Sequence, residues 1–161
     1  MATEQIQLVD GTIVRKCPTD KPLYCSRDGR FFSVHNMQIT EEGCIMREVL
    51  PAYPPSSGIP KKNMHGRYPY MRHFGSRTCH SLVWETWVGP RTKGLQIDHI
   101  NGNKMDWSLD NLEEVTPAEN RKRAKILRVL RSIGRDPKQM SREELLSIFS
   151  KYTFTNPQNL D

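Results

Sequence analysis

One stretch of the chain, LQIDHINGNKMDWSLDNLEEVTPAEN at residues 95–120, restricts the possible folds most strongly. Its first four residues predict a short strand, LEEV predicts a second strand, and the long polar segment between them predicts a loop. Thr116, Pro117 and Glu119 have the spacing of a helix N-cap, a proline at the first helical position and a capping box. The predicted order is therefore strand, loop, strand, helix, and pairing of the strands brings the end of the first near the start of the helix.

Polar side chains stand at the ends of these predicted elements. Asp98 and His99 end the first strand, Asn111 closes the loop, and Asn120 falls in the first turn or so of the helix. A carboxylate and a carboxamide oxygen are hard ligands that leave most of an octahedral shell open, as Mg²⁺ prefers. A neutral imidazole with a pKa of about 6.5 can accept a proton from water. A histidine alone is more often a surface residue, but this combination suits hydrolysis of a phosphodiester.

The helix is expected to run over residues 117–133, with Gly134 just beyond its end. Ile126, Leu130 and Ile133 share one face, which is expected to pack. Every charged residue from 121 to 135 is basic, and Arg121, Lys125, Arg128 and Arg135 share another face; Lys122, Arg123 and Arg131 add to the charge. With a net charge of +6 and a pI of about 9.3, this cationic stripe favours contact with nucleic acid, ahead of an acidic membrane surface. The alternative is a merely solvated face.

The N-terminal half predicts short antiparallel strands. Residues 1–20 are interpreted as an irregular arm with a short strand at 12–15. Turns at Asp28-Gly29 and Glu42-Gly43 predict two hairpins, residues 51–66 predict an exposed loop, and a third hairpin follows.

A short helix, SLVWETWV, comes next and stops at Gly89; its predicted core residues are Leu82, Val83, Trp84, Trp87 and Val88. A second capping box, Ser141 to Glu144, opens a last helix. The docked residues of that helix are expected to be Leu145, Leu146, Ile148 and Phe149. The fold class is therefore α+β, divided into a β-rich module at 1–75, a catalytic core at 76–135, and a C-terminal helix and tail at 136–161.

Composition narrows the cellular setting. The cysteines, at positions 17, 25, 44 and 79, form no CxxC pair, so we expect free thiols in a reducing compartment; a zinc site that uses Cys17 and Cys25 is the alternative. No apolar run approaches the roughly 20 residues of a membrane span, and the N-terminus lacks the features of a secretory signal. These features predict a soluble, cytoplasmic protein without a membrane partner.

The segment IDHINGNKMDWSLDNLEEVTPAENRKRA resembles the HNH motif of the His-Me finger, or ββα-metal, endonucleases, in the branch found in phages and homing nucleases. CHSLVWETWVGP is similar to the helix that precedes the motif in that branch, so the resemblance covers roughly residues 79–124. It implies an HNH endonuclease in which His99 is the general base and Asp98 the adjacent metal ligand. It also implies that Asn111 holds the loop and the histidine, and that Asn120 is the second metal ligand.

The resemblance further implies Mg²⁺ or Mn²⁺ as the cofactor, rather than Zn²⁺, because an asparagine oxygen replaces a histidine nitrogen at Asn120. It implies double-stranded DNA as the partner, contacted by Arg121, Lys122, Arg123, Lys125 and Arg128, with Lys61, Lys62 and Arg67 as further contacts. A homodimer would allow both strands to be cut.

Two alternatives remain open, namely an inactive DNA-binding protein on the same scaffold and a nuclease directed at RNA. His80 either hydrogen-bonds locally or contacts DNA. Trp107 stands where the family has a small polar residue, and it either packs or stacks on a base.

Overall fold

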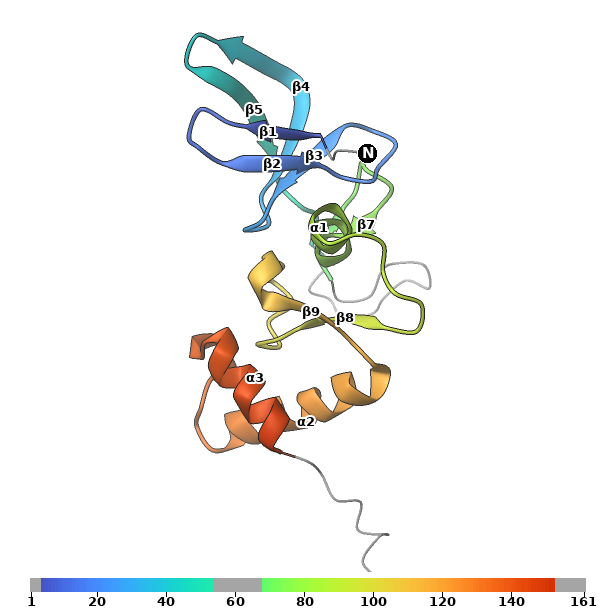
Figure 1. Cartoon of the computed structure of the whole chain (residues 1–161), viewed down its shortest axis with the longest axis vertical. Coiled ribbons are helices and arrows are strands. Elements are labelled where there is room, and N and C mark those ends of the chain that lie inside the picture. The colour runs from blue at the N-terminus through green and yellow to red at the C-terminus, as the bar shows by residue number, and fades with distance from the viewer. Residues whose placement is uncertain (1–3, 54–67, 153–161) are drawn as a thin grey trace, which may run out of the picture.

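The computed structural model describes residues 4–53 and 68–152, and it confirms the α+β class (Figure 1). A five-stranded antiparallel sheet has the strands in chain order. These strands are β1 (Gln5–Gln7), β2 (Ile13–Lys16), β3 (Leu23–Ser26), β4 (Phe31–Thr40) and β5 (Gly43–Val49). The hairpins predicted at Asp28-Gly29 and Glu42-Gly43 are confirmed, because these turns join β3 to β4 and β4 to β5.

The prediction of an irregular N-terminal arm was wrong, whereas the short strand predicted at 12–15 is present as β2. β1 pairs with β2, and an isolated bridge between Leu8 and Cys44 connects the segment after β1 to β5. The arm is held in place by apolar side chains, because Leu8 and Val14 are buried together with Tyr24, Phe32 and Met46 in a small core of their own. The sheet is therefore curled so that its first and last strands meet.

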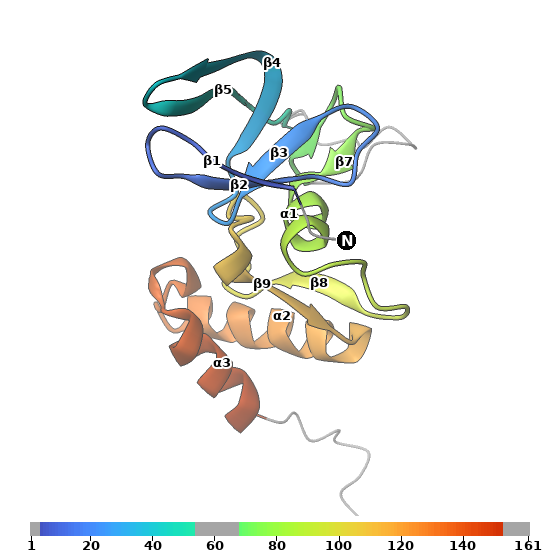
Figure 2. The same cartoon turned by 45° about the horizontal axis from the view of Figure 1, so that its top comes forward.

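Helix α1 (Cys79–Trp87) lies between this sheet and the lower half of the molecule (Figure 2). A two-stranded antiparallel sheet of β6 (Tyr70–Met71) and β7 (Arg77–Thr78) precedes it, which confirms the third predicted hairpin. The core around α1 contains Leu23, Phe31, Leu82, Val83 and Leu112, together with Cys17, Cys25, Met71 and Cys79. This core therefore combines side chains from the large sheet, from α1 and from the later strand that contains Leu112.

Two residues predicted as core are exposed. Val88, which is 57% exposed, follows the last residue of α1, where the chain turns away from the sheet. Ile133 is 64% exposed, because the helix that begins at Pro117 ends one residue earlier, at Ser132, and the chain turns at Gly134. In both cases the residue lies just after the last residue of the helix, so helical periodicity does not direct its side chain into the core.

The predicted strand–loop–strand–helix unit is present. Its elements are β8 (Gln96–His99), β9 (Leu112–Val115) and α2 (Pro117–Ser132), with a short 3₁₀ turn at Leu109–Asn111 before β9. Asp98 pairs with Glu113 and His99 with Leu112 in the antiparallel register. The Thr116 hydroxyl accepts a 3.1 Å hydrogen bond from the Glu119 backbone N–H, as expected for the N-cap of α2. Chain order and pairing therefore give a ββα unit.

Helix α3 (Arg142–Lys151) packs against α2. Ser141 caps α3 through a 3.1 Å bond from the Glu144 backbone N–H, as predicted. Leu145 and Phe149 are buried in the core between the two helices, with Ile100, Ile126, Leu127 and Leu130. The Arg142 guanidinium also donates to the Asp110 carbonyl at 2.6 Å, so α3 is attached to the start of β9 as well.

Trp107 joins the large sheet to the loop between β8 and β9. Its indole Nε1 donates a 2.7 Å hydrogen bond to the carbonyl of Gly29, in the β3–β4 turn. The Leu109 backbone N–H donates to the Arg27 carbonyl of the same turn at 2.8 Å. Trp107 therefore packs on this turn, which answers the question that the sequence left open.

We expect the substitution Gly29→Ala to reveal this contact. A Cβ at Gly29 would lie 2.7 Å from Trp107 Cδ1, and the residue has a φ of +88°. Gly11 is the matched control, because its φ is +84° and an added methyl group would meet nothing within 4 Å. Gly29→Ala should lower the free energy of unfolding in urea by about 1–3 kcal/mol more than Gly11→Ala does. Equal losses in the two variants would show that Trp107 moves aside freely.

Among residues 4–53 and 68–152, no helix is long and apolar enough to cross a membrane. Cys17, Cys25 and Cys79 are free thiols buried in the core around α1. Within the same ranges, no three or more His, Cys, Asp or Glu side chains are grouped so as to hold a metal ion. The zinc alternative at Cys17 and Cys25 therefore gains no further ligands from the described part of the chain.

Candidate active site

The residues singled out at the end of β8 and the start of α2 share one cavity. Asp98, His99 and Asn120 line a cavity of about 530 Å³, whose remaining wall includes Tyr68 and the basic side chains of Lys104, Arg128 and Arg131. The strand pairing in the ββα unit and the first turn of α2 produce this convergence. The cavity therefore holds a carboxylate, an imidazole and a carboxamide beneath a cationic rim.

His99 is 5% exposed, and its Nε2 atom is buried without a hydrogen-bond partner among the described residues. The Tyr68 ring stacks over it at 5.7 Å between centroids, and the His80 ring meets it edge-on at 5.0 Å. Burial, followed by the nearby charge of Lys104, lowers the pKa of His99 to about 4, although Asp106 opposes the shift. The imidazole is therefore neutral at neutral pH, with one nitrogen uncommitted.

Asp98 lies between this cavity and the interior. Its side chain is 12% exposed, and its Oδ2 is 3.4 Å from Arg123 Nη1. Burial raises the pKa of Asp98 to about 6, and the Arg123 charge offsets part of that effect. A carboxylate in this setting is only partly compensated by its single arginine neighbour, so an additional cation would favour its ionised form.

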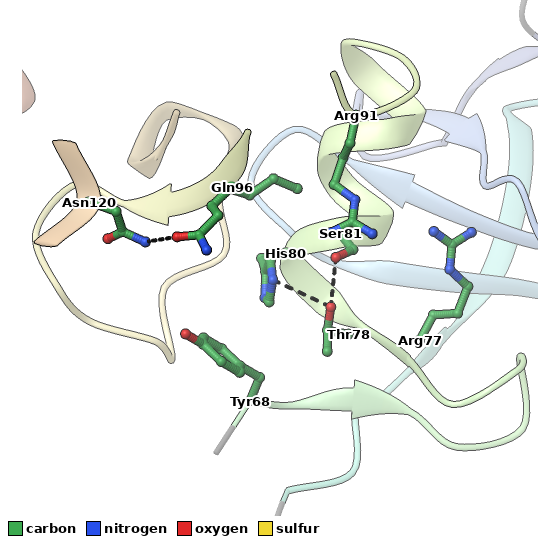
Figure 3. Close-up of a pocket in the computed structure, with 9 residues that line it drawn as sticks. Tyr68, Arg77, Thr78, His80, Ser81, Arg91, Gln96 and Asn120 are labelled. Carbon is green, nitrogen blue, oxygen red and sulfur yellow. Dashed lines mark hydrogen bonds between the residues drawn. The ribbon is translucent and has the colours of Figure 1, made fainter. Parts of the chain in front are cut away.

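Asn120 is oriented by a neighbouring side chain of β8. Its Nδ2 donates a 2.8 Å hydrogen bond to Gln96 Oε1, as Figure 3 shows. Because the amide nitrogen is engaged there, the carboxamide oxygen is left to serve as an acceptor or ligand. The pairing of Gln96 with Asn120 thus selects the oxygen as the functional atom.

Asn111 is buried and ties the loop together. Its Nδ2 donates to Asn101 Oδ1 at 2.9 Å and to the Asp106 carbonyl at 2.8 Å, and its Oδ1 accepts from the Asn101 backbone N–H at 3.1 Å. The Asn111 carbonyl also accepts from the Ile100 N–H at 2.9 Å. These bonds fix the two residues that directly follow His99, which is the geometry expected of a residue that holds the loop and the histidine.

The expectation that Arg123 belongs to an exposed DNA-contacting stripe was wrong. Its side chain is 8% exposed and forms ion pairs with Glu113 at 2.7 Å, Glu119 at 3.2 Å and Asp98 at 3.4 Å. The guanidinium also lies 4.8 Å from the centroid of the Phe149 ring. Arg123 is committed to these groups because it stands on the face of α2 that packs against β8, β9 and α3.

The other predicted DNA contacts are distributed differently. Arg121, Lys125 and Arg128 are exposed on α2, and Lys122 is partly buried beside Glu119 at 3.5 Å. Arg135 forms an ion pair with Glu144, so it belongs to the α2–α3 junction rather than to the stripe. Lys61, Lys62 and Arg67 lie outside the described residues.

Sequence reasoning missed several residues in or beside the cavity. Gln96 carried a usable signal, because it stands two residues before Asp98 in a strand and so shares its face. Tyr68 and Lys104 carried no such signal in the sequence, because both reach the cavity only through the tertiary fold. The Lys104 ammonium lies 4.4 Å from the centroid of the Tyr68 ring, so the two close the cavity together.

The segment that contains these residues is similar to known proteins. The sequence model of the HNH endonuclease family matches residues 77–122, a range that includes Asp98, His99, Asn111 and Asn120. The chain is also similar to Protein 3.8 of Escherichia phage T7, with 43% identity over 54 residues. That match covers 34% of this chain and 45% of the phage protein, so the chain spans less than half the length of this relative. No solved structure matches the chain significantly.

Proposed function

Taking residues 77–122 as an HNH endonuclease domain, we propose that this chain is a metal-dependent endonuclease that hydrolyses phosphodiester bonds in double-stranded DNA. HNH endonucleases act on DNA and generally use divalent metals. One observation supports the proposal above the others: a neutral histidine with an uncommitted nitrogen shares a cavity with a carboxylate and a carboxamide. The phage relative is in keeping with action in the cytoplasm of a bacterial or phage-infected cell.

The donor set fits a hard divalent cation. Asp98 and Asn120 would hold Mg²⁺, or Mn²⁺, through one carboxylate and one carboxamide oxygen, with water and phosphate in the remaining positions. When bound, the metal supplies positive charge that stabilises the charge developing on the phosphate and on the leaving oxygen. Gln96 serves this arrangement by engaging the nitrogen of Asn120 and leaving its oxygen available.

The protein groups around the cation account for the proton transfer. The His99 imidazole, which lines the cavity, accepts the proton of the attacking water, because burial keeps the ring neutral. The Tyr68 and His80 rings both contact the imidazole and each other, which restricts the orientation of the His99 ring. Asn111 fixes the loop that follows His99, so the ring keeps its orientation. His99 and Asn111 are thus the general base and its positioning residue.

The basic residues near the cavity would position the duplex. Lys104, Arg128 and Arg131 line the cavity, and Arg121 and Lys125 extend the positive surface along α2. Contacts of this kind set the register on the phosphate backbone and make affinity depend on salt. A monomer with one such site would nick one strand, whereas a homodimer could cut both.

A supercoiled-plasmid assay with a panel of divalent metals tests the proposal. We expect conversion to nicked or linear DNA with Mg²⁺ or Mn²⁺ and none with EDTA. DNA binding without cleavage in any metal would instead favour the inactive DNA-binding protein. Competition between duplex DNA and structured RNA in the same assay addresses the RNA-directed alternative.

The metal ligands can be tested apart from activity. Asp98→Asn keeps the shape of the side chain and a hydrogen-bond acceptor for Arg123, but it removes the charge. We expect this variant, and Asn120→Ala, to bind Mn²⁺ about tenfold more weakly or worse in calorimetric titration. Asp20→Ala is the control, because Asp20 is an exposed carboxylate that does not line the cavity. Unchanged Mn²⁺ binding by Asp98→Asn would count against Asp98 as a ligand.

A further inference from the structure

A second cavity of about 560 Å³ adjoins the one that holds Asp98 and His99. The two cavities share Tyr68, Ile97 and Asn120 as a common wall. The far wall of the second cavity comes from the start of α1 and the chain on either side of it, with Arg77, Thr78, His80, Ser81 and Arg91 (Figure 3). We refer to this space as the α1 pocket.

The α1 pocket carries an excess of positive charge. The guanidinium groups of Arg77 and Arg91 approach the same carboxylate, that of Glu85, at 2.6 Å and 3.8 Å. Arg77 also donates a 3.1 Å bond to the Pro18 carbonyl, so its guanidinium is largely committed to the fold. Arg91 is 53% exposed and has only the longer contact. One positive charge is therefore left without a matching carboxylate, and Arg91 is the group free to carry it to a ligand.

The rest of the α1 pocket is lined by neutral hydrogen-bonding groups. The Thr78 hydroxyl donates to Ser81 Oγ at 2.8 Å and lies 3.5 Å from His80 Nε2. No Asp or Glu is among the described residues that line the pocket. A cationic guanidinium beside hydroxyl and imidazole groups, without a carboxylate on the wall, matches the hydrogen-bonding needs of a phosphodiester oxygen.

The position of the α1 pocket indicates which phosphate of a bound strand it would contact. The His80 ring, on the wall of the α1 pocket, lies 5.0 Å from the His99 ring in the neighbouring cavity. A nucleic-acid strand that places one phosphate at His99 therefore continues along the shared wall into the α1 pocket. We infer that the α1 pocket binds a phosphate next to the reacting one on the same strand, with Arg91 as its charged contact. This inference rests on the proposed nuclease function.

The salt dependence of DNA binding tests this inference. In a His99→Ala background, which is expected to bind without cutting, fluorescence anisotropy measures the affinity for a duplex oligonucleotide over a range of KCl concentrations. Arg91→Ala should weaken binding and reduce the slope of log K against log salt by about 1, equally for two unrelated duplex sequences. Lys93→Ala is the matched control, since Lys93 is exposed, carries the same charge and lies outside both cavities. Arg91→Lys should retain most of the slope.

The possible outcomes separate this inference from the proposed function. Equal slopes for Arg91→Ala and Lys93→Ala would overturn the phosphate contact at the α1 pocket, even if the wild-type protein cuts plasmid DNA. Failure of the wild-type protein to cut, in any metal, would overturn the nuclease proposal instead. Thermal unfolding of Arg91→Ala should match that of Lys93→Ala, because the Arg91 side chain is 53% exposed and Glu85 keeps its closer ion pair with Arg77 at 2.6 Å.

Discussion

Replacement of His99 by alanine is expected to reduce plasmid cleavage by about 10²–10⁴-fold, the range that a positioned general base contributes. No other described imidazole shares the cavity with Asp98 and Asn120, so no second imidazole of that cavity can take over the proton. Duplex binding should remain largely intact, because the basic side chains of Lys104, Arg128 and Arg131 are unchanged. The measurement is the rate of loss of supercoiled plasmid with Mg²⁺, together with anisotropy on a duplex oligonucleotide.

The control for this variant is His73→Ala, because His73 is exposed in the turn between β6 and β7. It should cut DNA at the wild-type rate. Since His99 is buried, thermal unfolding must show that the alanine variant is folded, and His99→Asn provides a second variant that fills more of the space. An alanine variant that is folded and fully active would remove His99 as the base.

Replacement of Arg123 by alanine is expected to destabilise the fold by about 3 kcal/mol, because it leaves the largely buried carboxylate of Asp98 and the partly buried ones of Glu113 and Glu119 without their cation. Arg123 contacts Asp98, Glu113 and Glu119, and it packs over Phe149. Without the guanidinium, three carboxylates from β8, β9 and α2 would face one another at the junction with α3. Equilibrium unfolding in urea measures the loss.

Two further variants separate the causes of that loss. Arg121→Ala removes the same charge from an exposed position of α2, and it should change the free energy of unfolding by less than about 0.5 kcal/mol. Arg123→Met keeps much of the packing against Phe149 but not the charge, so it should recover only part of the stability lost in Arg123→Ala. If Arg121→Ala and Arg123→Ala are equally stable, the ion pairs around Arg123 do not hold these elements together.

Local sequence signals were sufficient for much of the fold. The turns at Asp28-Gly29 and Glu42-Gly43, and the caps at Thr116 and Ser141, depend on a few adjacent residues, and all four are present in the structure. Strand β1 depends on something else. Its three residues have no strong strand pattern, and they become a strand because β2 offers a partner and the sheet core accepts the apolar side chains beside them. That information lies in tertiary contacts.

The position of Arg123 shows a signal that was present but outweighed. Arg123 precedes Ile126, Leu127 and Leu130 by three, four and seven residues, so helical spacing places it on the packing face of α2. The run of basic residues suggested an exposed stripe instead. A count of basic residues does not show which way each side chain faces. Only the helical periodicity of α2 indicated that the Arg123 side chain faces the interior.

The core around α1 also limits how residues 77–122 could be moved between proteins. Residues 77–122 match the HNH endonuclease family, yet Leu82 and Val83 of that range pack on Leu23 and Phe31, which precede it. On the other side, Ile100 is covered by residues of α2 and α3 that follow it. If residues 77–122 alone were transferred to another protein, both apolar surfaces would be exposed to water, and we would expect the segment to collapse or aggregate. A graft that keeps its shape has to carry the face of the large sheet and the α2–α3 pair along with it.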